Sequence, residues 1–216
     1  MCVNCVSRFM FHVSKRKIKM EKVSINKTIR LSQHYTLGEM TKTGTGIPNI
    51  PSRVSIENLR NICENWLEEL RRRYNERYVF EEGGRFFEEG GRFFEEGGRR
   101  KEEGEYSKGR EETEEAEETE EAEEPIVITS GYRSPEVNRA VGGSPTSNHL
   151  TGCAVDIRCA GVEQALRYAV ILMDYADESR QDYDELLIER NKSGRYWVHF
   201  AVRPKENRRK TLFLQK

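Results

Sequence analysis

Apolar residues recur at steps of three and four positions along residues 56–70, a pattern that predicts an amphipathic helix with one face in a core. Ser55 is expected to cap the start of this helix. A second amphipathic helix is predicted over residues 162–175, directly after Gly161. Its inward side chains are expected to be Ala165, Leu166, Ala169, Val170 and Met173.

Two shorter helices are also predicted. Thr36 is expected to cap a short helix that begins at Leu37, with Glu39 in its first turn. Residues 135–141 predict another short helix. The Gly- and Pro-rich run TGTGIPNIPS, which precedes the long helix, must be a loop.

Four stretches have the composition or the alternation of β-strands. The first is residues 126–129, and the second is HLTGCAVDIRC, whose alternation places Ala154 and Asp156 on one side. YDELLIER and RYWVHFAVR follow, joined by the turn-like NKSG. Strands and helices in this order predict an α+β fold: a single domain built on a mainly antiparallel sheet with flanking helices.

The middle of the chain departs from both patterns. The unit FEEGGR(F/R) repeats every seven residues from Phe80, and a Glu-rich run follows as far as residue 124. Each unit carries a Gly pair where a coiled-coil heptad needs helix formers. The segment is therefore interpreted as a low-complexity insertion in a loop, mostly disordered. The alternative is an acidic arm that binds a partner.

The chain divides where its composition changes. Met20 opens a more domain-like sequence, which is consistent with a misassigned start upstream of it. The expected parts are an N-terminal lead (1–30), the first half of the domain (31–79), the insertion (80–124), the second half of the domain (125–204) and a basic tail (205–216).

Composition excludes some partners. The net charge of −1 gives no general attraction to nucleic acid or to an anionic membrane. No apolar run approaches the roughly 20 residues that span a bilayer. The N-terminal basic cluster follows its apolar stretch, unlike a secretory signal, and the five cysteines form no regular frame. A monomer in a reducing compartment, cytoplasmic by default, is the expectation.

Three residues carry the candidate chemistry: His149 and Asp156 in SNHLTGCAVDI, and His199 in RYWVHF. Imidazole and carboxylate groups are natural ligands of zinc, and three protein ligands leave the fourth tetrahedral position open. The alternative is that a histidine beside Trp197 on a strand is simply a half-buried, hydrogen-bonded side chain. Spacing alone leaves both interpretations open.

Several blocks of the sequence resemble the M15 family of zinc peptidases, and most of all its D-alanyl-D-alanine carboxypeptidases and phage murein endopeptidases. The blocks are YTLGEM, GIPNIPS and ENLR, then SGYRSPEVNRAVGG, SNHLTGCAVDI and WVHF. They fall within Ser32–Arg60 and Pro125–Val202, in the family's order. The resemblance implies a hedgehog/D-Ala-D-Ala-peptidase-like fold that holds one Zn²⁺ ion. The implied ligands are His149, Asp156 and His199.

The resemblance also implies roles for residues around the metal. Arg133 would face a substrate carboxylate or the scissile carbonyl oxygen, a task that suits a planar, always charged guanidinium. Its alternative role is an internal bridge to Asp156 or Glu136. Ser147 is expected to hydrogen-bond near the site, and Gly152 to permit a close backbone approach. Ser147, Tyr196 and Trp197 join Arg133 as expected substrate-binding residues.

One position departs from the family. Family enzymes commonly carry an acidic residue three positions before the last zinc histidine, and Tyr196 stands there in this chain. A carboxylate is needed to move a proton from water to the leaving amine, and Tyr is a poor base near neutral pH. Glu189, on the preceding strand, is the expected catalytic base, and Glu185 is a weaker candidate. Tyr196 could instead stabilise an oxyanion.

The resemblance thus implies a zinc-dependent metallopeptidase that hydrolyses the stem peptides of peptidoglycan, as a D,D-carboxypeptidase or a murein endopeptidase. The alternative is a catalytically weak or inactive zinc-containing module that binds cell-wall peptides. A third interpretation makes the acidic repeat the functional part. A cell-wall substrate without an export signal would require release by lysis or another start site.

Overall fold

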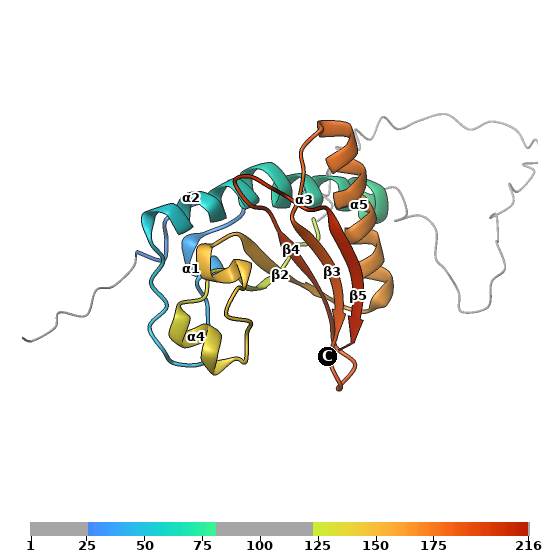
Figure 1. Ribbon diagram of the computed structural model, residues 1–216. Coiled ribbons are helices and arrows are strands. Elements are labelled where there is room, and N and C mark those ends of the chain that lie inside the picture. Colours follow the sequence, from blue (N-terminus) through green and yellow to red (C-terminus); the bar gives the residue numbers. More distant parts are fainter. Residues whose placement is uncertain (1–25, 81–122, 216) are drawn as a thin grey trace, which may run out of the picture.

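The computed structural model describes residues 26–80 and 123–215 (Figure 1). The expectations for the N-terminal lead and for the low-complexity insertion lie almost wholly outside these residues. Within them, no helix has the length and the apolar character that crossing a membrane requires.

Five strands form one sheet in the order β1-β2-β4-β3-β5. Three of the four neighbouring pairs are antiparallel, and only β3 and β5 run parallel. The predicted α+β fold with a mainly antiparallel sheet is therefore confirmed. The strands are β1 (Ile128–Ser130), β2 (Ala154–Cys159), β3 (Glu185–Arg190), β4 (Tyr196–Ala201) and β5 (Lys210–Gln215).

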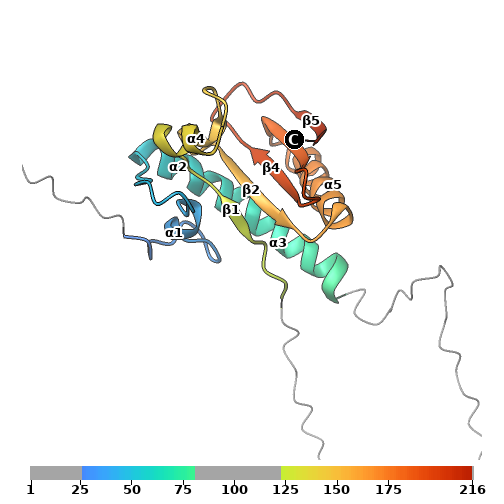
Figure 2. The same cartoon turned by 90° about the horizontal axis from the view of Figure 1, so that it is seen from below.

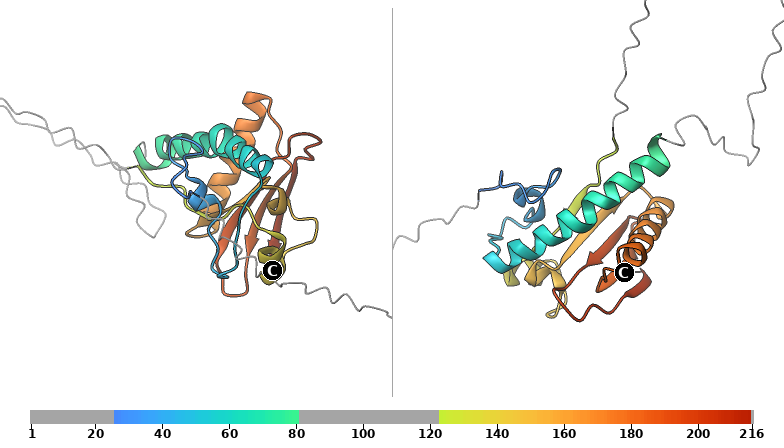
Figure 3. Two further views of the ribbon diagram at one scale, coloured as in Figure 1. Left: turned by 90° about the vertical axis from the view of Figure 1, so that its left-hand side faces the viewer. Right: turned by 90° about the horizontal axis from the view of Figure 1, so that it is seen from above.

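Two long helical segments cover the same face of this sheet. They lie in front of the strands when the molecule is seen from above (Figure 3), and behind them when it is seen from below (Figure 2). One is a single α-helix, α5 (Val162–Ser179). The other is an uninterrupted helical run with two π-helical stretches: α2 (Arg53–Ile62), η1 (Cys63–Leu67), α3 (Glu68–Tyr74) and η2 (Asn75–Phe80).

Two details of these helices differ from the prediction. The Ser52 side chain, not that of Ser55, caps α2, and it accepts a hydrogen bond from the Ser55 N–H at 3.1 Å. On α5, Leu166 and Val170 are exposed rather than inward. Neighbouring helical positions differ by about 100° in direction, so an apolar pattern this wide does not identify the packed face. The buried residues are Ala165, Tyr168, Ala169, Ile171, Leu172 and Ala176.

The covered face of the sheet is apolar. Alternate positions of β2, β4 and β3 point into the core, among them Val155, Phe200 and Leu186, all fully buried. The ring of Trp66, from η1, packs edge-on against Tyr175 and at a tilt against Phe200. The ring centroids are 5.3 Å and 5.1 Å apart, respectively. Burial of these large side chains is the main source of stability for the domain.

The intervening positions face the other way. The β2–β4 register pairs Asp156 with His199, and the β3–β4 register pairs Glu189 with Trp197. Successive strand residues point to opposite faces, so these polar side chains share the face that the long helices do not cover. The residues with reactive side chains therefore lie on one face of the sheet.

Short helical elements complete the described part of the fold. They are α1 (Leu37–Met40), α4 (Pro135–Ala140) and η3 (Asn148–Thr151). The expected Thr36 cap of α1 is present, with Glu39 completing a capping box. Buried Asn49, in the predicted loop, donates to the Tyr132 carbonyl at 2.8 Å and accepts from the Ser134 N–H at 2.7 Å. Asn49 thus holds the loop that carries Arg133.

The segment expected to be a basic tail contributes an edge strand. Within residues 205–216, β5 pairs in parallel with β3 from Lys210 opposite Glu185 onward. The short apolar run Leu212–Leu214, between polar residues, is the pattern that could have predicted a strand there.

The two ends of the described chain around the insertion meet at one place. The Asn75 side chain accepts from the Glu124 N–H at 2.6 Å and donates to the Glu124 carbonyl at 3.1 Å. Arg71 forms an ion pair with Glu123 at 2.9 Å. The described chain therefore stops near Asn75 and resumes beside it at Glu123 and Glu124.

Candidate metal centre

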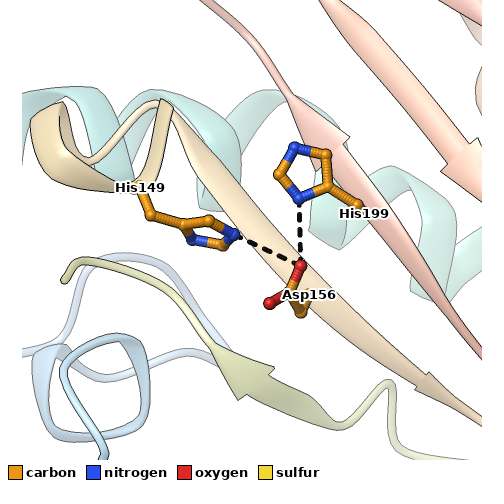
Figure 4. A group of neighbouring side chains, drawn as sticks. All are labelled: His149, Asp156 and His199. Atoms are coloured by element: carbon orange, nitrogen blue, oxygen red, sulfur yellow. Dashed lines mark hydrogen bonds and ion pairs between the residues drawn. The ribbon is translucent and has the colours of Figure 1, made fainter. Parts of the chain in front are cut away.

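His149, Asp156 and His199 come together at the open face of the sheet (Figure 4). They belong to three elements: η3, β2 and β4. One nitrogen of each imidazole points to the same carboxylate oxygen, with His149 Nε2 at 3.3 Å and His199 Nδ1 at 3.0 Å from Asp156 Oδ1. The ligand atoms all lie within 4.8 Å of one another.

His149 is oriented by the turn that carries it. The Ser147 side chain accepts a hydrogen bond from the His149 backbone N–H, as the expectation of a nearby hydrogen bond requires. Gly152 ends the turn at φ +73°, and a Cβ there would lie 2.4 Å from the Ser55 carbonyl oxygen. Gly152 therefore makes the close backbone approach that the sequence predicted.

The ring of His149 has a defined tautomer. Its Nδ1 lies 2.6 Å from the Gly131 carbonyl oxygen, which can only accept, so Nδ1 carries the proton. Nε2, which faces Asp156, is then the nitrogen that would bind a metal. A backbone carbonyl behind a ligand histidine is a common support in metal sites. Gly131 itself packs so closely that a Cβ would lie 2.4 Å from the Met40 carbonyl oxygen.

Arg133 lies against the same carboxylate. Its Nη2 forms an ion pair with Asp156 Oδ2, and its Nε donates to Ser130 Oγ at 2.8 Å. The bridge to Asp156 that the sequence left open is therefore present, whereas Glu136 pairs with Arg139 at 3.4 Å. Because Oδ2 is engaged by Arg133, Asp156 keeps Oδ1 for the two histidines.

Burial and charge act against each other in this cluster. Burial alone would raise the pKa of Asp156, but the two histidines hold it well below its usual range. Burial alone would lower the pKa of His199, but its contacts with Asp156 and Glu185 raise it to about 9. Both pKa shifts favour the charged forms, a protonated His199 and an ionised Asp156. A bound metal would replace that proton as the positive charge.

The donor set fits a divalent metal. A tetrahedral zinc holds nitrogen and oxygen ligands at about 2.0–2.1 Å, which places the ligand atoms roughly 3.3 Å apart. The spacings from Asp156 Oδ1 to the two imidazole nitrogens are 3.3 and 3.0 Å. Two imidazoles and one carboxylate are also a ligand set that leaves one coordination position open.

The cluster opens into a cavity of about 970 Å³. Its lining includes Arg133, Ser147, Glu189 and Trp197. Tyr196 does not line the cavity: it alternates to the opposite face of β4 and stacks near Phe213, with ring centroids 6.3 Å apart. The structure therefore does not bring Tyr196 to the metal cluster.

Several cavity residues were not anticipated. Arg208 and Lys210 come from the supposed tail, and Asn148 and Arg203 flank the ligand-bearing elements. Recognising Arg208 and Lys210 required the strand β5, because only the parallel pairing with β3 brings them beside Glu185.

The fold is that of an α+β protein, and its cavity contains a group of two histidines and one aspartate that could hold a metal ion. Residues 111–181 match a family model described as Peptidase M15. The match supports an M15 family peptidase, in agreement with the resemblance of the motifs, and M15 peptidases are metallopeptidases that hydrolyse peptide bonds. It includes His149 and Asp156 and ends before His199. A comparison with curated proteins finds no match.

Proposed function

We propose that this protein is a zinc-dependent metallopeptidase that hydrolyses the stem peptides of peptidoglycan. The supporting observation is the convergence of His149, Asp156 and His199 in a cavity that also contains a buried carboxylate, Glu189. A zinc ion held by the three side chains would polarise the scissile carbonyl and lower the pKa of a water molecule in its open position.

Glu189 is the proposed catalytic base. It stands opposite Trp197 in the β3–β4 ladder, on the same face as His199 and two pairs further along. Only 3% of the residue is exposed, although it lines the cavity. From this place it would accept a proton from the attacking water and pass it to the leaving amine.

Arg133 and Trp197 are the proposed substrate contacts. Arg133 uses Nε on Ser130 and Nη2 on Asp156, and its other N–H groups are assigned to a carboxylate or carbonyl oxygen of the peptide. The half-buried Trp197 ring offers an apolar wall beside Glu189. In this proposal Ser147 acts indirectly, because it supports the turn that carries His149.

The test combines metal analysis with digestion of purified sacculi followed by mass spectrometry. The expected result is about one zinc per chain and shortened or unlinked stem peptides, whose masses identify the bond that is cut. Glu189→Gln should keep its zinc and lose about 10²–10⁴-fold in hydrolysis. The control is Glu163→Gln, an exposed glutamate on α5 whose side chain pairs with Arg167, and its rate should not change.

The alternative is a zinc-containing module that binds cell-wall peptides without cleaving them. The observation in its favour is Tyr196, which stands where family enzymes commonly carry an acid and which points away from the cavity. Stoichiometric zinc and measurable binding of stem peptides, with no cleavage of any of them, would favour this alternative. A protein that binds neither zinc nor peptide would overturn both.

A further inference from the structure

The two ring nitrogens of His199 face different carboxylates. Nδ1 lies 3.0 Å from Asp156 Oδ1, so Nδ1 is the nitrogen available to a metal. Nε2 lies on the far side of the ring, 3.6 Å from Glu185 Oε2. The second carboxylate is therefore placed behind the ligand, where it can fix the direction of the ring.

Strand register explains this placement. Glu185 is the first residue of β3 and stands opposite Ala201 in β4, two pairs away from the pair of Leu187 and His199. Glu185 and His199 are thus diagonal neighbours on one face, a distance that long side chains span. The small side chain of Ala201 leaves that diagonal open.

Glu185 is itself held from three directions. It accepts from Asn148 Nδ2 at 3.2 Å, and Arg208 and Lys210 form ion pairs with it at 3.1 and 3.3 Å. Only 16% of the side chain is exposed. A carboxylate with so many donors keeps one orientation, which suits a support more than a group that must exchange protons with a substrate.

Asn148 connects this carboxylate to the other histidine. It directly precedes His149 in η3, and its amide donates both to Glu185 Oε2 and, at 2.8 Å, to Asp184 Oδ2. One acidic pair at the start of β3 therefore contacts the ring of His199 and the turn that carries His149.

We propose that Glu185 is a positioning residue of the metal centre, which holds His199 with Nδ1 toward the metal and ties both ligand histidines to the β3–β5 edge of the sheet. The inference rests on the proposed zinc site. A carboxylate that accepts from the non-ligating nitrogen fixes the tautomer and the orientation of the ring, and loss of such a partner lowers metal affinity about 10–100-fold.

The experiment measures zinc affinity by competition with a chromogenic chelator, and the absorption spectrum of the cobalt(II)-substituted protein. Glu185→Ala should weaken zinc binding by about 10–100-fold and change the cobalt bands, because the ring is free to turn. Glu185→Gln retains an oxygen that can accept from Nε2–H, so its affinity should fall between those of Glu185→Ala and wild type. The control is Glu206→Gln, which removes an exposed carboxylate paired only weakly with Arg203 at 3.7 Å.

The outcomes separate this inference from the proposed function. If wild type binds zinc and Glu185→Ala binds it equally well with an unchanged cobalt spectrum, the positioning role is wrong and the zinc enzyme stands. If wild type binds no zinc, the proposed function itself fails. If Glu185→Ala does not fold, two other variants provide the test: Glu185→Gln and Arg208→Ala, which removes one ion-pair partner of Glu185. Wild-type zinc affinity in both variants would overturn the inference.

Discussion

The two faces of the sheet are made by the same strands but carry opposite chemistry. On the face covered by α2–η1–α3 and α5, strand side chains such as Val155, Val198 and Phe200 are apolar and fully buried. On the other face, Asp156, His199 and their neighbours are polar yet also nearly buried. The first face is stabilised by removal of apolar surface from water, whereas the second tolerates burial only because its charges contact one another.

This contrast explains how the site is kept in place. Alternation fixes every polar side chain of β2 and β4 to the face opposite the packed core, so a shift of register by one residue would bury charge among apolar groups. The apolar face therefore enforces the register on which the candidate metal centre depends. The polar face contributes less stability of its own, because its paired charges lose hydration on burial.

The chain's two tryptophans give the largest test of the contrast, since Trp66 lies in the core and Trp197 in the cavity. Trp66→Ala should lower the free energy of unfolding by about 3–5 kcal/mol, because it leaves a void between Tyr175 and Phe200. Trp197→Ala should cost clearly less, since its ring is only half-buried. Urea denaturation of the metal-free proteins measures both. Equal losses would mean that the open face is as important to stability as the core.

Two glycines with left-handed backbone test how tightly the site is attached to the helical layer. Gly152→Ala should destabilise the protein by about 2–4 kcal/mol and weaken zinc binding, because a Cβ would collide with the Ser55 carbonyl and push the His149 turn away from α2. Gly142→Ala has a similar φ of +70° but open space around the Cβ, so only about 1 kcal/mol of strain is expected. Thermal melts and chelator competition compare them. If the two variants lose similar stability and zinc affinity, the close approach of Gly152 to the Ser55 carbonyl is not what makes Gly152→Ala destabilising.

Adjacent arginines allow a buried ion pair to be compared with an exposed one. Arg208 binds the fully buried Asp184 through two nitrogens, each at 2.7 Å, whereas Arg209 pairs with Asp177, whose side chain is 72% exposed. Asp184→Asn should cost about 1–3 kcal/mol, because it weakens charge-assisted bonds at a buried group. Asp177→Asn should stay within about 0.5 kcal/mol. Chemical denaturation at neutral pH measures the free energy of unfolding of both variants. Equal losses would contradict the view that the buried Asp184 pair contributes more stability than the exposed Asp177 pair.

The same aspartate predicts a pH dependence. Burial tends to raise the pKa of Asp184, but hydrogen bonds from Arg208 and Asn148 lower it overall. A carboxylate with a lowered pKa in the folded state stabilises the fold above its unfolded pKa of about 3.9, and this stabilisation is lost as the pH falls through the folded pKa. The loss of stability between about pH 4 and lower values should therefore be shallower in Asp184→Asn than in wild type. Identical pH profiles would show that Asp184 does not contribute.

The smallest effect is expected from removal of the insertion. Joining Phe80 to Glu123 through a short Gly/Ser linker should leave zinc affinity unchanged and alter stability by about 1 kcal/mol or less, since shortening a loop changes closure entropy only slowly. Glu123 and Glu124 must remain, because they contact Arg71 and Asn75. Circular dichroism and chelator competition give the result. Loss of folding or of zinc would instead favour a functional role for the acidic repeat.

Much of the fold was accessible from local patterns. Alternation and helical periodicity predicted β2, β3, β4 and the two long helical segments, because each must place one apolar face in the core. The strand β5 was missed because the basic residues before it gave the segment the character of a tail, although its short apolar run favours a strand that pairs with β3. The inward face of α5 was predicted partly wrong because Leu166 and Val170 lie beside the buried stripe, not on it.

For the site, the histidines and the aspartate were accessible as residue types in motifs, and Gly152 as a close approach. The groups that hold these side chains in place were not accessible from the sequence. Gly131 acts through its backbone carbonyl, which no side-chain pattern reveals. Tyr196 and Glu189 could be told apart only from the direction of their side chains, which the register of β3 against β4 defines.

By itself the sequence determined which segments are strands and helices of the core and which residues are capable of binding a metal, because burial periodicity and ligand chemistry are properties of the residues themselves. Only the tertiary structure decided that His149, Asp156 and His199 meet, that Tyr196 turns away, and that Glu185 stands behind His199. These facts depend on strand order and register, which arise from contacts between residues far apart in the chain.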